Sequence, residues 1–230
     1  MQRFLDILLS GMALILLSPL LVPVAIILRF TGEGEIFFKQ NRVGRGGQMF
    51  GLYKFATMLK DSPNIGTGTV TLKGDPRVLP VGRILRKTKI NELPQLINIF
   101  LGDMSVIGPR PQTRRCFDAF PQKSQAIITT VRPGLSGIGS IVFRDEEEMM
   151  DAASDPDHFY DHVIMPYKGE LEEWYVRNQG IATYVMLIAL TIWVVLSPTS
   201  PIVWRVFPSL PTPPKMLQRD VNFPDSTVDA

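Results

Sequence analysis

Apolar residues in this 230-residue chain are concentrated in two long uncharged runs on either side of a mixed central part. The first run, residues 7–28, is long enough to cross a bilayer as a helix, because about 20 apolar residues span the hydrocarbon core. The second run, residues 181–196, is short for a crossing. It predicts a helix that packs on a folded domain or lies at the membrane interface, with a second crossing as the less favoured alternative.

Two features of the first run favour a re-entrant helix over a straight crossing. Pro19 has no N–H, and its ring collides with the carbonyl of Ile15. We therefore expect a bend there, with the Ser18 hydroxyl bonding a carbonyl that the bend leaves free. Cationic residues flank both ends, Arg3 before the run and Arg29 after it, which places both ends on the cytoplasmic side. A helix bent at Ser18 and Pro19 that enters and leaves by one leaflet satisfies both facts, and a simple transmembrane helix is the alternative.

The polar–apolar pattern of the central part changes character several times. Residues 36–55 alternate in the manner of a β-hairpin, with turn glycines between 43 and 47. Residues 61–75 are rich in Gly, Ser, Asn and Thr and predict a loop. Helical patterning resumes after Pro80.

A second central helix is predicted with Asn91 as its N-cap, Glu92 in its first turn and Gly102 as its stop. The unpaired N–H groups at such a helix start, next to the basic segment 83–89, predict an anion site. Glu92 could there hold a divalent cation against phosphate oxygens. The plainer alternative is a cap and a dipole-complementing acid without further function. The apolar stripe of this helix consists of Leu93, Leu96, Ile97 and Phe100.

Charge and cysteine content narrow the class of protein. The net charge of +2 is too small to indicate a nucleic-acid partner. The lone Cys116 excludes an internal disulfide and fits a reducing compartment. The basic residues nevertheless cluster, as contacts to lipid or substrate phosphates would. The clusters are Lys39, Arg42 and Arg45; Arg83, Arg86, Lys87 and Lys89; and Arg110, Arg114 and Arg115.

Two further segments are given ordinary interpretations. His158 and His162 lie four residues apart with Asp157 and Asp161 beside them, which predicts a solvated helix start rather than a metal site. The prolines between 198 and 214 predict an extended or disordered tail, a candidate for pairing two subunits.

Taken together, the ordered segments resemble the monotopic phosphoglycosyltransferases, bacterial sugar transferases that start glycan assembly on undecaprenyl phosphate. The resemblance covers most of residues 3–180, and so many matches in order are not expected by accident. The segments are Phe37 to Gln40, Arg42 to Arg45, Tyr53 to Phe55, Asp75 to Val78, Leu85 to Thr88, Glu92 to Leu96, Gly102 to Ser105, Gly108 to Pro111 and Arg132 to Gly137.

What the resemblance implies is a two-step displacement. A carboxylate of an Asp-Glu pair attacks the sugar-linked phosphate of a UDP-sugar, and the phosphosugar then passes to the lipid phosphate, with Mg²⁺ neutralising charge. The catalytic positions implied are Asn91, Glu92 and Asp103, with Glu92 also the metal ligand. The implied phosphate contacts are Lys54, Arg86, Lys87, Gln95, Arg110 and Arg144.

The same resemblance implies the setting. The fold is expected to be α+β: a re-entrant membrane helix-break-helix at 1–33, a mostly helical cytosolic domain with a small β-hairpin at 34–180, and an apolar helix with a Pro-rich tail at 181–230. Expected partners are a UDP-sugar, undecaprenyl phosphate, membrane lipids, downstream glycosyltransferases and a second copy in a homodimer. The expected location is the cytoplasmic face of the bacterial inner membrane.

The chain departs from the family pattern at a critical position. Asn91 occupies the place of the nucleophilic Asp, and an amide cannot form a phospho-aspartyl intermediate. Three explanations stay open: Glu92 takes the nucleophile's role, the lipid phosphate attacks directly, or the chain is a catalytically silent membrane scaffold. We favour Glu92, because the surrounding phosphate-binding features are intact. In a smaller departure, Ala56 replaces a cation that is common in the family.

Overall fold

The computed structural model describes residues 1–62, 75–151, 153–197 and 200–224. The chain falls into two compact units. The amino-terminal unit contains Phe4–Asn41 and Phe50–Gly102, and the carboxyl-terminal unit contains Met1–Arg3, Arg42–Met49 and Asp103–Ala230. The predicted loop at 61–75 lies almost wholly outside the described residues.

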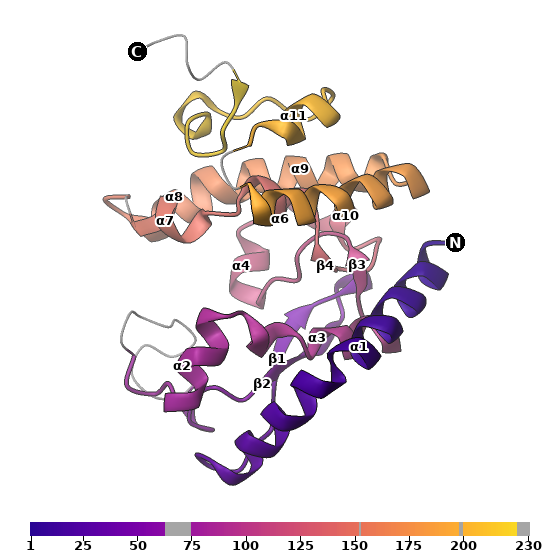
Figure 1. Ribbon diagram of the computed structural model, residues 1–230. Coiled ribbons are helices and arrows are strands. Elements are labelled where there is room, and N and C mark those ends of the chain that lie inside the picture. The colour runs from indigo at the N-terminus through magenta and orange to yellow at the C-terminus, as the bar shows by residue number, and fades with distance from the viewer. Residues whose placement is uncertain (63–74, 152, 198–199, 225–230) are drawn as a thin grey trace. The chain divides into compact units, whose positions relative to one another are not determined.

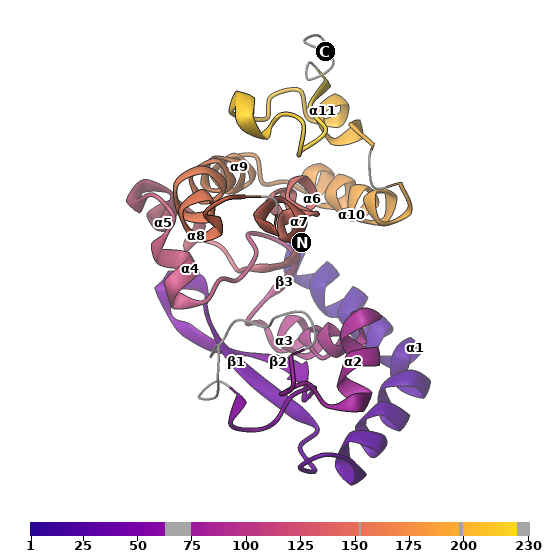
Figure 2. The same ribbon diagram turned by 90° about the vertical axis from the view of Figure 1, so that its left-hand side faces the viewer.

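Helix α1 dominates the amino-terminal unit and runs continuously over Gln2–Phe30, with Pro19 and Pro23 inside it (Figure 1). Its axis changes direction along its length (Figure 2). The Ser18 hydroxyl donates to the carbonyl oxygen of Ile15 at 2.7 Å, the group that Pro19 leaves without its backbone donor. The predicted bend and its hydroxyl compensation are therefore confirmed, whereas the predicted interruption into two helices is wrong.

By length and composition, α1 is the helix among the described residues that could cross a membrane. Its most apolar stretch has a mean hydropathy of 2.5 and is only 11% buried. Large side chains such as Ile15 and Leu16 are more than 70% exposed. The polar exceptions are buried: Asp6 and Ser10 lie on the covered face, and the Ser10 hydroxyl donates to the Asp6 carbonyl.

The predicted hairpin is confirmed. Strand β1 (Phe37–Val43) pairs with β2 (Met49–Phe55), and a short 3₁₀ turn, η1 (Arg45–Gly47), joins them. Gly46 and Gly47 both have positive φ, 68° and 73°, which explains the turn glycines.

Two short helices come next among the described residues. Helix α2 (Pro80–Lys87) begins at the predicted proline and buries Gly82 and Leu85. Gly82 has to be glycine for a packing reason, because an added Cβ would collide with the Thr57 carbonyl. A 3₁₀ turn, η3 (Ile90–Glu92), then leads to α3 (Gln95–Leu101).

The predicted bounds of the helix at Asn91 are wrong at its start and right at its end. Asn91 lies inside η3 and caps nothing, because α3 begins after Pro94. Gly102 ends the helix at a φ of 105°, as expected. Phe100 is 45% exposed, and the buried apolar side chains are Leu96 and Ile99. The anion site predicted at the helix start stays a prediction, at a 3₁₀ turn followed by a seven-residue helix.

The carboxyl-terminal unit contains two longer helices, several short ones and two three-residue strands. Strand β3 (Ser105–Ile107) pairs in parallel with β4 (Gly134–Ser136), an arrangement that the sequence did not predict. Helix α6 lies against both α9 and α10 (Figure 2). The helices are α4 (Arg114–Asp118), α5 (Gln122–Ile128), α6 (Ile138–Val142), α7 (Glu146–Asp151), α8 (Pro156–Phe159), α9 (Met165–Arg177), α10 (Ile181–Leu196) and α11 (Ile202–Val206), with a π-helical turn η4 (Tyr160–Ile164) and a 3₁₀ turn η5 (Lys215–Leu217).

Helix α10 is packed on one face, as the prediction of a packed apolar helix requires. Tyr184, Leu187, Leu190 and Val194 are buried, whereas Trp193 is 47% exposed. Both alternatives, packing on the domain and lying at an interface, are therefore compatible with its two faces.

The tail between 200 and 224 is folded, contrary to the prediction. Trp174 of α9 stacks edge-on against Phe207 and donates to the Ser209 hydroxyl, and Tyr167 donates to the Pro211 carbonyl at 2.7 Å. The aromatic residues override the prolines because their burial fixes the chain that carries them. Pro198 and residues 225–230 lie outside the described residues.

Candidate active site

Glu92 and Lys54 form the charged centre of the amino-terminal unit. Lys54 Nζ of β2 lies 3.6 Å from Glu92 Oε1, at the end of η3, and the two side chains are 20% and 26% exposed. A carboxylate and an ammonium group that are both largely covered but still reachable suit a phosphate ligand, which can contact the cation directly.

Asn91, which directly precedes Glu92 in the chain, is buried. Its side chain is 7% exposed, and its Oδ1 has no hydrogen-bond partner among the described residues. A buried acceptor without a protein partner is costly. Lys89, two residues earlier, has a φ of 58°, a strained backbone for a non-glycine residue. The strained turn and the unpaired oxygen both lie directly before Glu92.

The donor set at this point fits a magnesium ion of the kind held mainly by substrate phosphates. Mg²⁺ takes oxygen ligands and keeps several of its waters, so one or two protein oxygens suffice. Glu92 offers a carboxylate and Asn91 an unpaired amide oxygen. No cluster of three or more His, Cys, Asp or Glu that could hold a metal occurs in the described part of the chain. These residues therefore do not form a complete magnesium site without substrate phosphates.

Asn98 is a positioning residue that sequence reasoning missed. It is fully buried in α3, its Oδ1 accepts from the Tyr53 backbone N–H at 2.9 Å, and its Nδ2 donates to the Gly51 carbonyl at 2.9 Å. This side chain thus completes the backbone hydrogen bonding of β2 directly before Lys54. An Asn in the middle of an otherwise apolar stripe is the signal that could have found it.

The other predicted residues of this unit differ in burial. Arg86 is half-buried, with Nη1 3.5 Å from Met58 Sδ, and Lys87 is exposed at the end of α2. Gln95 is buried at the start of α3. Ala56 is buried, so a cation would not be accommodated at this position as the chain is packed.

A buried ion pair supports this unit from the side. Arg77 contacts both oxygens of Asp75, with Nη2 to Oδ2 at 2.6 Å, and also donates to the Ser62 carbonyl. Both side chains are at most 5% exposed. The segment from Asp75 to Val78, one of those that carry the family resemblance, therefore has a stabilising role in this chain.

Three predicted site residues belong to the carboxyl-terminal unit: Asp103, Arg110 and Arg144. Asp103 and Arg110 are exposed. Arg144 donates from Nη1 to the Val194 carbonyl at 2.7 Å and so holds the end of α10. Its role toward a substrate stays a prediction.

The loop that carries Arg110 is tightly fixed. The Gly108 N–H donates to the Ser136 carbonyl at 2.9 Å, and the Gly134 N–H donates to the Pro109 carbonyl at 2.8 Å. An added Cβ at Gly134 would collide with the backbone of Gly108. The two glycine-containing segments thus approach each other closely, and the exposed guanidinium of Arg110 projects from a rigid backbone.

Glu172 of α9 is a second residue that sequence reasoning missed. Burial raises its pKa to about 7, against the opposing influence of Lys168 and of the backbone N–H groups of Arg110 and Gly139. Lys168, one turn earlier, is 2% exposed and pairs with Glu146. An added Cβ at Gly139 would collide with the Glu172 carboxylate. A carboxyl group that titrates near neutrality thus lies behind the Arg110 loop.

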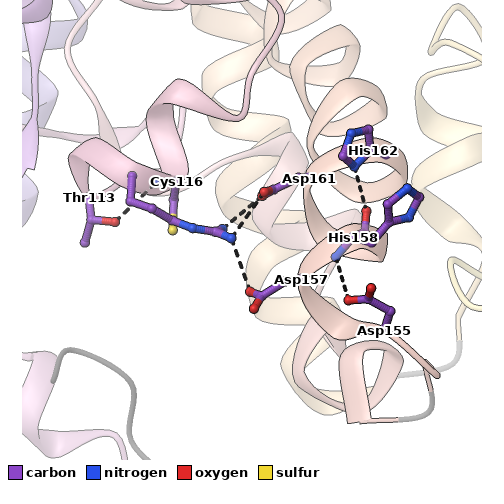
Figure 3. A network of polar contacts seen from close by, with 8 residues as sticks. Thr113, Cys116, Asp155, Asp157, His158, Asp161 and His162 are labelled. Atoms are coloured by element: carbon purple, nitrogen blue, oxygen red, sulfur yellow. Dashed lines mark hydrogen bonds and ion pairs between the residues drawn. The ribbon is translucent and has the colours of Figure 1, made fainter. Parts of the chain in front are cut away.

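The histidine segment behaves as predicted. Arg115 bonds Asp161 at 2.9 Å and Asp157 at 3.2 Å, while His158 and His162 stack on the same helical stretch (Figure 3). Asp157 and Asp161 both pair with the Arg115 guanidinium, which favours a solvated surface network over a metal site.

Comparison with known proteins gives consistent results. The family model described as "Bacterial sugar transferase" matches residues 1–198. The UDP-N-acetylgalactosamine-undecaprenyl-phosphate N-acetylgalactosaminephosphotransferase of Aeromonas hydrophila is 33% identical over 198 residues, which cover 85% of this chain and 44% of that protein.

Two further relatives extend the comparison. The exopolysaccharide production protein ExoY of Rhizobium meliloti is 34% identical, over 63% of this chain and 70% of that protein. The UDP-glucose:undecaprenyl-phosphate glucose-1-phosphate transferase of Escherichia coli is 30% identical, over 84% of this chain and 39% of that protein. The matches to both named transferases thus span less than half of those longer proteins, and the match to the exopolysaccharide protein spans most of its length.

Proposed function

We propose that this chain, which belongs to the bacterial sugar transferase family, transfers a sugar-1-phosphate from a UDP-sugar to undecaprenyl phosphate and releases UMP. The names of its relatives supply the substrate classes. The observation that carries the proposal is the largely covered pair of Glu92 and Lys54, directly after Asn91, whose buried Oδ1 has no hydrogen-bond partner among the described residues.

In the proposed first step, a Glu92 carboxylate oxygen attacks the sugar-linked phosphorus. A bond forms between that oxygen and phosphorus, and the bond from phosphorus to the bridging oxygen breaks, so that UMP leaves with the electron pair. Lys54 is placed to neutralise phosphate charge next to the attacking oxygen. In the second step, an oxygen of the lipid phosphate attacks the same phosphorus and frees Glu92.

Several groups would support this chemistry. Glu92 and the Asn91 amide oxygen would hold Mg²⁺ together with substrate phosphates, and the bound cation would supply charge neutralisation. Arg110, on its rigid loop, offers a further guanidinium to phosphate. The apolar and exposed α1 supports a location in the bacterial inner membrane, with the remainder on the cytoplasmic face.

The test is UMP release from a panel of UDP-sugars with undecaprenyl phosphate and Mg²⁺. We expect Glu92→Gln to lower the rate by on the order of 10²-fold or more, because the amide cannot act as the nucleophile. Glu35→Gln is the matched control, since Glu35 also pairs with a lysine, Lys60, but lies exposed. Full activity in Glu92→Gln would move the catalytic role to Asp103.

Intact-mass analysis separates the open routes. Incubation with the donor alone should add one phosphosugar to the wild-type chain at Glu92. UMP release that requires the lipid, with no adduct, would indicate direct attack by the lipid phosphate. No UMP from any donor would favour the rival function, a catalytically silent membrane scaffold, which the amide at Asn91 supports.

A further inference from the structure

Helix α9 contacts the Arg110 loop, residues 107–112, at two points. The Tyr175 hydroxyl donates to the Ile107 carbonyl at 3.1 Å, and both groups are buried. Glu172 lies one turn earlier on α9 and is 1% exposed. Its carboxylate is close enough to the Arg110 backbone N–H for this donor to lower its pKa. One helix therefore contacts the loop both at its start and at the residue that carries the guanidinium.

Further bonds fix the loop through groups whose charge is constant. The Arg42 guanidinium donates to the Pro111 carbonyl at 3.3 Å. The Val43 N–H donates to the Gln112 carbonyl at 2.9 Å, and the two glycine N–H bonds described above add to these. A guanidinium and backbone amides do not titrate near neutral pH. Of the partners named, only Glu172 can change its charge there.

The Glu172 carboxylate is short of hydrogen-bond partners. Neither of its buried oxygens has a full hydrogen bond among the described residues. Besides the Arg110 N–H, the Gly139 N–H of α6 also lies close to it. Lys168, one turn earlier, attracts the carboxylate, but this ammonium group also pairs with Glu146 of α7. A buried carboxylate with so few bonds is costly when ionised, and a closer bond to a nearby N–H stabilises it.

Charged side chains on the other elements packed against α9 contact other groups. Lys123 of α5 has its Nζ 3.6 Å from Glu173 Oε2, and Asp161 of η4 bonds Arg115. Helix α6 contains no charged residue. The charges that act on Glu172 are those of Lys168 and Arg110.

We propose that Glu172 is a positioning residue for the donor diphosphate: its carboxylate holds the Arg110 N–H and thereby fixes the direction of the Arg110 guanidinium. The inference rests on the proposed function for the identity of the ligand. Burial raises the pKa of Glu172 to about 7, so the carboxylate is ionised above this pH and carries a proton below it. A charged acceptor binds an N–H more strongly than a neutral one. Donor binding should therefore weaken as the pH falls through about 7.

The first test measures binding to the full chain in lipid nanodiscs by calorimetry. The probes are UDP-glucose and UDP-N-acetylgalactosamine in which a methylene group replaces the bridging oxygen, so that no transfer occurs. We expect the wild-type Kd for at least one analogue to rise about tenfold from pH 8 to pH 6, because a neutral acceptor replaces a charged one. Glu172→Gln should have the pH 6 Kd at both pH values. Glu172→Asp, which retains the charge, should keep the pH dependence.

Glu173→Gln is the matched control, because Glu173 is also a buried acid of α9 but pairs with Arg177 and accepts from Ser124. It should melt at a lower temperature and keep the wild-type pH dependence of the Kd. Glu172→Gln should instead melt higher than wild type at pH 8 while binding the analogue more weakly, because an amide costs less to bury than a carboxylate. A loss of both stability and affinity in Glu172→Gln, or a pH dependence equal to that of wild type, would overturn the proposal.

A double substitution tests whether Glu172 acts through Arg110. In an Arg110→Gln background, Glu172→Gln should change the Kd less than about twofold. An equal effect in both backgrounds would contradict the proposal, as would failure of the wild type to bind either analogue. UMP release from the natural donors is measured in parallel. Coupling without UMP release means that the proposed function fails and the positioning role stands, and UMP release without coupling means the reverse.

Discussion

Asn98 illustrates how a single buried amide can order the surroundings of the candidate nucleophile. It bridges α3 to β2 by bonding the Tyr53 N–H and the Gly51 carbonyl. Both backbone groups lie within three residues of Lys54, the partner of Glu92. The geometry of the charged pair thus depends on the backbone that Asn98 holds in place.

Removing this amide should therefore affect both stability and activity. Asn98→Leu leaves a backbone donor and an acceptor without partners, which costs about 1–3 kcal/mol in the free energy of unfolding. Thermal unfolding in detergent and UMP release measure the two effects. Asn178→Leu is the control, because Asn178 is an exposed amide bonded only to its own helix end. Equal melting temperatures for both variants would contradict the positioning role.

Glu172 gives a prediction for pH. Its pKa is raised from 4.5 to about 7 by burial, so in this range the folded state holds a proton that the unfolded state has lost. The free energy of unfolding should accordingly fall as the pH rises from about 4.5 to 7, by up to about 1.4 kcal/mol per unit. Glu172→Gln should flatten this dependence and raise stability at pH 8. Glu170→Gln, on the exposed side of α9, should retain the wild-type slope.

Among the elements, those with local signals could be predicted and those with long-range causes could not. The hairpin and α2 carry their own turn glycines and proline, and both were predicted. The pairing of β3 with β4 joins three-residue strands across a long connection, and no periodicity of the sequence reports it. The folded tail was missed because its aromatic contacts to α9 outweigh its prolines.

The residues of the candidate site also divide into those that local sequence signals predict and those that depend on long-range contacts. Glu92, Lys54 and Arg110 were predicted through the resemblance of short motifs, and the structure pairs Glu92 with Lys54. Asn98 and Glu172 were missed, because their importance comes from burial against distant parts of the chain. The start of the Asn91 helix was misplaced because the strained Lys89 and the 3₁₀ turn compete with a simple cap.

Helix α2 provides a test at the scale of an element. Gly82 lies so close to the Thr57 carbonyl that a methyl group would force the helix away from it. We expect Gly82→Ala to lower the free energy of unfolding by about 1–3 kcal/mol, the usual cost of overpacking. Arg83→Ala, on the exposed side of the same helix, should change stability by less than about 0.5 kcal/mol. Melting temperatures of the two variants decide the matter, and a stabilising Gly82→Ala would contradict the close packing.

For the whole molecule, the path of α1 determines which side of the membrane each unit faces. The helix is long enough to cross, and its prolines and flanking cations favour re-entry. The predicted reaction needs the units that carry Glu92 and Arg110 to share one compartment.

Cysteine labelling measures this topology directly. In a Cys116→Ser background, Phe4→Cys and Glu35→Cys place single thiols at the two exposed ends of α1. We expect both to resist an impermeant maleimide in intact cells and to react in inverted vesicles. Labelling of one position in intact cells and the other only in inverted vesicles would establish a full crossing.

Asn91 also has a consequence for how this chain can evolve. Asn and Asp have nearly the same shape and differ by one base in their codons, so the family's carboxylate pair is a single mutation away. The buried position leaves Oδ1 without a partner among the described residues, so the reverted acid would place a second charge beside Glu92. Such a revertant gains a nucleophile but depends on a bound cation to offset the repulsion. Selection in magnesium-poor and magnesium-rich media should therefore favour different residues at this codon.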